Sequence, residues 1–186
     1  MRNIRFRRRR EALTNYKHRL ALVKSGMDRI VVRKTNRRII AQVVRYDEHG
    51  DRILKHVEST ALSAYKWPAR SNRASAYLTG LLLARRILKG GGEPGREYIL
   101  DIGLSSPVKN SIPFVFARGC TDGGLKLRSG VESDDSIFSI ATEYAKKLKE
   151  DNGRYARQFG RYIKDGTAPE TLGDLFRETR EKILKE

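Results

Sequence analysis

The sequence predicts an α/β fold, and three observations support this prediction. Three β-rich runs, 28–34, 37–46 and 52–59, follow one another with short polar turns between them, which is typical of an antiparallel meander. A helical apolar pattern over 73–89 then ends in three consecutive glycines. The apolar run 97–103 comes next, and a buried strand that follows a helix in this way indicates a right-handed crossover. We therefore expect an α/β structure in which helices pack against a mixed sheet.

The chain begins with an arginine-rich segment. Residues 1–10 offer almost nothing to bury, so we expect an arm that stays disordered until it meets a partner. Thr14 is expected to cap the helix that follows, and Gly26 to supply its left-handed end. One face of that helix carries apolar side chains at helical spacing: Tyr16, Leu20 and Val23.

The helix over 73–89 is expected to be largely buried, with Asn72 immediately before it. Apolar residues form one face and widen it: Ala74, Tyr77, Leu78, Leu81, Leu82, Leu83, Ala84, Ile87 and Leu88. The apolar run that begins at Pro113 fits a strand or a helix by periodicity alone. Pro113 in a first turn and glycines 123 and 124 at the end favour a short helix, followed by a strand near 125–128.

Three further helices are predicted at the C-terminus. Ser133 is expected to cap the first, with Asp134 and Asp135 in its first turn. The third is expected to start near Pro169. Apolar stripes mark the buried face of each helix in turn: Ile137, Ile140, Ala141, Tyr144 and Leu148; Tyr155, Phe159, Tyr162 and Ile163; Leu172, Leu175, Phe176 and Ile183.

The charge predicts a polyanionic partner, which is RNA, DNA or an anionic membrane. The net charge is +17 and the pI about 10.3. Residues 1–38 contain fourteen Lys and Arg against Glu11 and Asp28, a net charge of +12. The N-terminal fifth is therefore the main electrostatic element.

The single cysteine and the hydropathy indicate the compartment in which the protein is expected. Cys120 is expected to be a buried thiol, and it excludes an internal disulfide and a multi-cysteine metal site. No apolar run reaches the roughly 18 residues needed to span a bilayer. No apolar stretch follows the basic residues as in a secretory signal. We expect a soluble, intracellular protein in a reducing compartment.

The arginine-rich arm is the first candidate RNA-binding element. Arginines grip phosphates with two parallel hydrogen bonds, and Phe6 or Tyr16 can stack on an unpaired base. A nuclear-localisation signal or a merely solubilising tail is the alternative. The candidate residues are Arg5, Phe6, Arg7, Arg8, Arg9, Arg10 and Tyr16.

Three further basic groups are candidates for RNA contacts. The first surrounds a tight turn whose backbone N–H groups can approach phosphate, the second lies at a helix N-terminus, and the third is a stripe on a C-terminal helix. They comprise Arg33, Lys34, Thr35, Asn36, Arg37 and Arg38; Lys66, Arg70, Asn72 and Arg73; and Arg154, Arg157, Arg161 and Lys164. The alternatives are an exposed hairpin and solvated charge. Trp67 fits stacking on a base and a role in the core equally well.

Catalytic interpretations find little support. His18, His49 and His56 lack metal-ligand spacing. The glycine-rich stretches "GGGEPG" and "TDGG" lack the spacing of a phosphate loop and are interpreted as helix ends. The remaining alternative is a magnesium-dependent RNA hydrolase of ribonuclease-H-like topology that uses Asp101 and Asp122. We expect no cofactor, no metal and no catalysed reaction.

Six segments, taken in order, resemble one known family. They are "FRRRREALTNY", "VRKTNRRIIAQVV", "AYLTGLLLARRIL", "YILDIGL", "TDGGL" and "QFGRYIKDGTAPE". Together they resemble the archaeal and eukaryotic type of large-subunit ribosomal protein that binds 5S ribosomal RNA, the universal large-subunit protein eighteen family. The chain lacks the eukaryotic insertions around Pro94 and Pro107, so it resembles the archaeal members.

The resemblance implies a fold and an organisation. It implies an α/β core with a mixed sheet of about five strands flanked by helices, and it supports a helix over 113–122. The expected parts are a basic arm over 1–13, a core that binds 5S rRNA over 14–130 and a helical extension over 131–186.

The resemblance also implies a function and partners. It implies a structural constituent of the cytoplasmic large subunit, which joins 5S rRNA to 23S rRNA in the central protuberance beside neighbouring ribosomal proteins. No membrane and no small-molecule substrate is expected. Besides the arm and the turn, the matching positions expected to contact 5S rRNA are Thr14, Tyr16, Lys17, Arg19, Lys109, Asn110 and Ser111.

Overall fold

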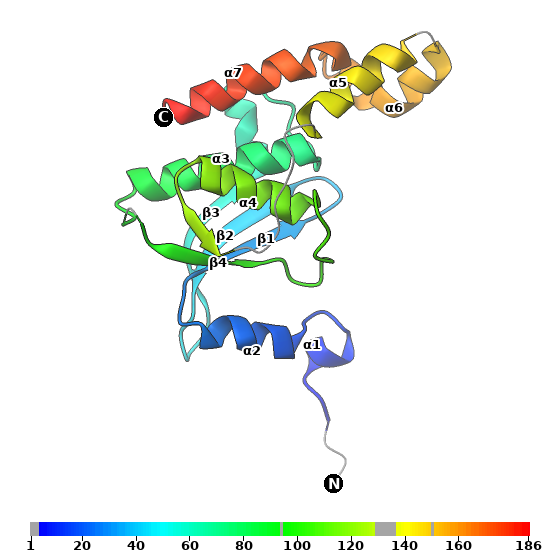
Figure 1. Ribbon diagram of the computed structural model, residues 1–186. Coiled ribbons are helices and arrows are strands. Elements are labelled where there is room, and N and C mark those ends of the chain that lie inside the picture. The colour runs from blue at the N-terminus through cyan, green and yellow to red at the C-terminus, as the bar shows by residue number, and fades with distance from the viewer. Residues whose placement is uncertain (1–3, 94, 129–136, 150) are drawn as a thin grey trace.

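A five-stranded mixed sheet lies at the centre of the computed structural model, which describes residues 4–93, 95–128, 137–149 and 151–186 (Figure 1). The strand order is β3-β2-β1-β4-β5. The strands are β1 (Arg29–Lys34), β2 (Ile39–Arg45), β3 (Arg52–Glu58), β4 (Glu97–Asp101) and β5 (Lys126–Arg128). β1, β2 and β3 pair antiparallel, whereas β4 is parallel to both β1 and β5. The predicted α/β class, meander and crossover strand are confirmed.

Two helices cover one face of this sheet. They are α3 (Arg73–Lys89) and α4 (Ile112–Asp122), with Asn72 as the cap of α3. The helix expected over 113–122 is confirmed, and Pro113 lies in its first turn. Gly80 and Gly119 let the two helices approach closely, because a Cβ at either position would collide with the backbone of the other helix. The expected burial of α3 is also confirmed, since eleven of its residues are buried.

The alternation of side chains along the strands separates a core face from an open face. On β1, Ile30 and Val32 are buried in the core under the helices. Arg29, Val31 and Arg33 occupy the opposite face because successive strand residues point to opposite sides. The sheet therefore carries arginine side chains on the face that α3 and α4 leave open.

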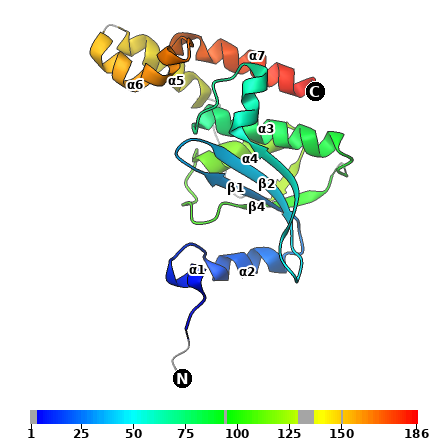
Figure 2. The ribbon, with the colours of Figure 1, turned by 180° about the vertical axis from the view of Figure 1, so that it is seen from behind.

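The N-terminal helices differ in detail from the expectation. They are α1 (Arg7–Arg10) and α2 (Tyr16–Lys24), and α2 lies on the open side of the sheet (Figures 1 and 2). Asn15, not Thr14, caps α2 by accepting a hydrogen bond from the His18 amide. The Thr14 hydroxyl instead accepts a hydrogen bond from Arg8 Nε at 2.8 Å. Gly26 ends the segment with φ +68°, as expected.

The apolar stripe expected on α2 is not the side of the helix that is buried. Leu20 is 55% exposed, whereas Leu22 is buried. Arg19, three residues before Leu22 and on the same side of the helix, pairs with Asp51 at 3.0 Å. The side of α2 that faces the sheet therefore combines an ion pair with a buried leucine.

The C-terminal helices form a further layer above α3. They are α5 (Ile137–Leu148), α6 (Asn152–Lys164), the 3-10 helix η2 (Pro169–Thr171) and α7 (Leu172–Leu184). The expected cap Ser133 and the acidic pair Asp134 and Asp135 lie outside the described residues. Ile163 is 46% exposed, so it does not belong to the buried face of α6. That face turns toward α5 and η2 through Phe159, which leaves Ile163 in solvent.

An aromatic cluster joins α7 to the core. The Phe176 ring lies 6.0 Å from the Trp67 ring and 5.5 Å from the Tyr77 ring. Trp67 follows the 3-10 helix η1 (Ser59–Tyr65), which the sequence did not predict. None of the helices among the described residues is long and apolar enough to cross a membrane.

Candidate nucleic-acid interface

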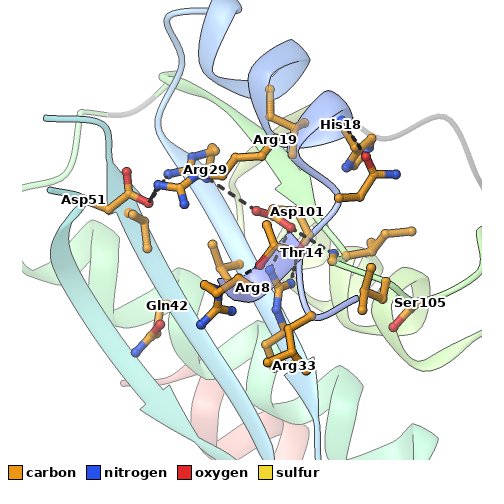
Figure 3. A pocket seen from close by; sticks show the side chains of 18 of the residues that line it. Arg8, Thr14, His18, Arg19, Arg29, Arg33, Gln42, Asp51, Asp101 and Ser105 are labelled. Atoms are coloured by element: carbon orange, nitrogen blue, oxygen red, sulfur yellow. Dashed lines mark hydrogen bonds and ion pairs between the residues drawn. The ribbon is translucent and has the colours of Figure 1, made fainter. Parts of the chain in front are cut away.

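A cleft of about 800 Å³ lies between α2 and the open face of the sheet (Figure 3). α2 and the arm form one wall, β1 to β3 form the other, and the loop after β4 closes one end. The polar and charged side chains labelled around it are Arg8, Thr14, His18, Arg19, Arg29, Arg33, Gln42, Asp51, Asp101 and Ser105. The cleft thus collects residues from five separate segments of the chain.

An ion-pair network fixes the shape of this cleft. Arg29 is only 3% exposed, and its guanidinium contacts Asp51 at 2.7 Å and Asp101 at 3.5 Å. Asp51 also pairs with Arg19 of α2 at 3.0 Å, and Asp101 pairs with Arg33 at 2.9 Å. Three arginines therefore share two carboxylates. The network ties α2 to the sheet and leaves the cleft with an excess of positive charge.

The arm beside the cleft is partly ordered. The expectation that residues 1–10 lack structure is wrong for Arg7–Arg10, which form one helical turn. The turn is held because Arg8 bonds to Thr14 and because the Phe6 ring lies 6.1 Å from the Tyr16 ring. None of the residues of α1 is buried. The arginine side chains are therefore available to a partner in solution.

The β1–β2 turn presents a second basic surface. Thr35 Oγ1 accepts a hydrogen bond from the Arg38 amide at 3.0 Å and donates one to the Arg38 carbonyl at 2.8 Å. These bonds close the turn and project Lys34, Asn36 and Arg37 outward, where all three are exposed. Arg38 pairs with Glu58 at 2.8 Å and is half exposed. Lys34 also lines the cleft, so the turn and the cleft form one continuous basic surface.

The predicted site around Lys66 does not form a single surface. Arg70 pairs with Asp165, donates to the Arg161 carbonyl and lies over the Tyr162 ring at 5.5 Å. Trp67 is buried and donates from Nε1 to Ser75 Oγ at 2.9 Å. The role in the core is therefore correct for Trp67, and stacking on a base is not.

Asn72 is likewise engaged within the chain. Its Oδ1 accepts from the Ser75 amide and its Nδ2 donates to the Tyr162 hydroxyl. The oxygen of this side-chain amide thus caps α3, and its nitrogen attaches α6. Lys66 and Arg73 are exposed beside these contacts.

The comparison with known proteins identifies the family. A family model described as ribosomal large subunit proteins 60S L5 and 50S L18 matches residues 2–94, which is half of the chain and includes the arm, the meander and α3. The chain belongs to this large-subunit ribosomal protein family. It is a structural constituent of the cytoplasmic large ribosomal subunit, with ribosomal RNA and ribosomal proteins as its partners. Family membership points to a structural role and not to catalysis.

The geometry of this large-subunit protein also argues against the hydrolase alternative. Asp101 is held by Arg29 and Arg33 on the open side of the sheet. Asp122 accepts a hydrogen bond from the Tyr77 hydroxyl at 2.6 Å, at the end of α4. Within the described part of the chain, no group of three or more His, Cys, Asp or Glu residues is placed to hold a metal ion. The two carboxylates therefore serve separate structural contacts.

Cys120 is buried, as expected, with no exposed surface. Burial raises the pKa of its thiol, so the reactive thiolate is disfavoured. The thiol packs within α4 against the core and serves the protein as a small apolar group.

The basic stripe on α6 lies at the opposite end of this ribosomal protein from the arm (Figures 1 and 2). Arg154, Arg157, Arg161 and Lys164 are all exposed. Lys109, Asn110 and Ser111 belong to the loop between β4 and α4, the same loop whose residues 102–105 line the cleft. Asn110 adopts a left-handed conformation with φ +61°.

Several residues of the cleft were not predicted from the sequence. Arg29, Asp51 and Gln42 come from two strands and a loop, and Leu104 follows β4. The available signal was the period of two within β1, which places Arg29 on the same face as Arg33. The partner carboxylates carried no such signal, because they are distant in the sequence.

Proposed function

We propose that this large-subunit protein binds 5S rRNA through the arm, the cleft and the β1–β2 turn, and that it joins 5S rRNA to 23S rRNA in the central protuberance. The single observation that carries the proposal is the continuity of these three basic surfaces on one side of the molecule. The arm, the turn and most of the lining of the cleft belong to the segment that the family model matches, and residues 101–105 of the cleft follow it. A second basic surface on α6, at the opposite end, supports a bridging role.

The mechanism is electrostatic binding with recognition of RNA shape. The major groove of A-form RNA is too narrow and deep for side chains to read bases. Selectivity must come from the geometry of the phosphates, the wide minor groove, the 2′-hydroxyls and unpaired bases. The rigid turn at Thr35 and the tethered α2 offer cations at fixed spacing, which suits one backbone geometry better than another.

The proposal assigns a role to each basic group. The arm and the start of α2, including Lys17 and Arg19, contact 5S rRNA together with residues 33–38 of the turn. The loop at Lys109 to Ser111 extends this surface beyond the cleft. The stripe of α6 meets 23S rRNA or a neighbouring ribosomal protein, while Arg70 and Asn72 hold α6 in place. In this proposal the arm and the α/β core bind 5S rRNA, and the helical extension contacts 23S rRNA or a neighbouring protein.

A salt titration of 5S rRNA binding tests the proposal. If the arm and the turn neutralise about six to eight phosphates, the logarithm of the affinity should fall with the logarithm of salt with a slope of about −0.7 to −0.9 per contact. The double variant Lys34→Gln, Arg37→Gln should reduce the slope by about 1.4 to 1.8, because two contacts are lost. A slope near −1 for the unaltered protein would contradict the proposal.

A matched control distinguishes the loss of specific phosphate contacts from the loss of overall positive charge. The double variant Arg177→Gln, Lys182→Gln removes the same charge from α7, where Arg177 is 81% exposed. This control should keep the original slope. If both double variants lower the slope equally, binding depends on net charge alone and the assigned surface is wrong. The RNA should remain intact when it is incubated with the protein and Mg²⁺.

A further inference from the structure

The walls of the cleft carry exposed apolar side chains. Leu13 before α2, Ile53 on β3 and Leu104 after β4 are each at least half exposed, and all three line the cleft. Large apolar groups that gather at one exposed place mark a binding surface, because leaving them in water is unfavourable. A surface that bound only phosphates would gain no affinity from these apolar side chains.

The apolar lining continues into the cleft below its cationic rim. Val31 and Val44 form part of the floor between the exposed walls. Arg8, Arg19 and Arg33 line the same cleft (Figure 3). A flat ring with apolar faces, polar edges and an attached phosphate matches this distribution. A nucleotide has that chemistry.

Size and RNA geometry specify the state of the nucleotide. A volume of about 800 Å³ lies within the range of small-molecule pockets, about 300–1,000 Å³. A paired A-form duplex cannot lay a base face against the floor, because its bases are stacked inside the helix. A nucleotide that has left the stack can do so, and its unstacking costs least where it is already unpaired.

We propose that the cleft between α2 and the open face of the sheet takes one unpaired nucleotide of the bound RNA. Its base lies against Val31, Val44 and Ile53, and its phosphate meets the arginine rim. The inference rests on the proposed function in requiring an RNA partner, and it adds that recognition depends on an extruded base. The ion pairs of Asp51 with Arg19 and Arg29 tie α2 to the sheet on which the cleft is built.

The test compares two synthetic RNAs, a fully paired duplex and the same duplex with one unpaired nucleotide. The full-length protein should bind the bulged duplex about tenfold more tightly than the paired one, because placing one base face against aliphatic side chains removes apolar surface from water. The double variant Ile53→Ala, Leu104→Ala should lose most of this preference while keeping its affinity for the paired duplex and its salt slope. Circular dichroism checks that the variant is folded.

The matched control is the double variant Leu54→Ala, Val108→Ala. Leu54 is adjacent to Ile53 on β3 and Val108 belongs to the same loop as Leu104, both are exposed, and both lie outside the lining of the cleft. The control should retain the preference. The proposal is overturned if the Ile53 and Leu104 variant retains it, or if the unaltered protein has none, as expected for a cleft that receives a side chain of a neighbouring protein.

The two proposals fail in different ways. Preference for the bulged duplex without preference for 5S rRNA would support the cleft proposal and contradict the proposed function. Selective binding of 5S rRNA that the Ile53 and Leu104 variant leaves unchanged would contradict the cleft proposal alone.

Discussion

Asn72 Nδ2 donates a hydrogen bond to the Tyr162 hydroxyl at 2.7 Å, and this contact joins the first turn of α3 to α6 across 90 residues of sequence. Arg70 lies over the same ring at 5.5 Å, and the neighbouring Ser71 hydroxyl donates to the Thr35 carbonyl at 2.6 Å. One short segment therefore contacts both the β1–β2 turn and the C-terminal helices.

Removing the Tyr162 hydroxyl should weaken this attachment. Tyr162→Phe leaves the part-buried Asn72 amide without its acceptor, so the free energy of unfolding should fall by about 1 kcal/mol in urea unfolding. Arg154→Ala, on the exposed stripe of the same helix, should change it by less than about 0.5 kcal/mol. Equal effects from both variants would mean that the contact contributes nothing to stability.

Substitution by alanine should have opposite effects at two helical glycines, because only one of them lies in the close contact between α3 and α4. A Cβ at Gly119 collides with the Tyr77 carbonyl, whereas a Cβ at Gly160 in α6 meets no atom within 4 Å. Gly119→Ala should lower the free energy of unfolding by about 3 kcal/mol or more through overpacking. Gly160→Ala should raise it by about 0.5 to 1 kcal/mol, because alanine favours the helix. A tolerated Gly119→Ala would disprove the close approach.

The Cys120 thiol should be unreactive in the folded protein. Burial raises its pKa and shields the thiol from reagents, so Ellman's reagent at pH 8 should label it much more slowly in the native protein than in concentrated guanidinium chloride. Rapid labelling of the native protein would show that α4 is open to solvent.

The raised pKa of Cys120 should also make the stability of the folded protein depend on pH. A raised pKa in the folded state contributes stability that is fully present below the pKa of the unfolded thiol, 9.0. Stability should therefore decline as the pH rises above that value. The variant Cys120→Ala should lack this component of the decline in thermal melts between pH 8 and pH 10, and an unchanged decline would contradict the assignment.

Deleting residues 1–10 should separate binding from folding. Because no residue of α1 is buried, the thermal transition should hardly move. RNA affinity should fall strongly, and the salt slope should shrink by about 0.7 to 0.9 for each phosphate contact that is lost. An unfolded truncated protein would show instead that the arm is structural.

The core of the fold could be predicted from sequence because its signals are local. The strands of the meander and the helix over 73–89 carry their own periodicity and end at glycines or polar turns. The helix over 113–122 needed the family resemblance in addition, since a short apolar run suits either structure.

The site was less predictable because its geometry depends on distant partners. The positive charge of the arm and the turn is visible in the sequence. The cleft is not, since it requires Asp51 and Asp101 to hold Arg19, Arg29 and Arg33. The contacts of Asn72 with Tyr162 and of Arg70 with Asp165 were not predicted for the same reason, because these partners are about 90 residues away.

A gel-shift competition at near-physiological salt distinguishes specific recognition of 5S rRNA from non-specific binding of RNA by a basic protein. Labelled 5S rRNA bound to the full-length protein is challenged with unlabelled 5S rRNA or with an unrelated structured RNA of the same length. If the protein recognises 5S rRNA, unlabelled 5S rRNA should displace the label at about 10²-fold lower concentration than the unrelated RNA. Equal competition by the two RNAs would show that the protein is a non-specific polycation and does not recognise 5S rRNA.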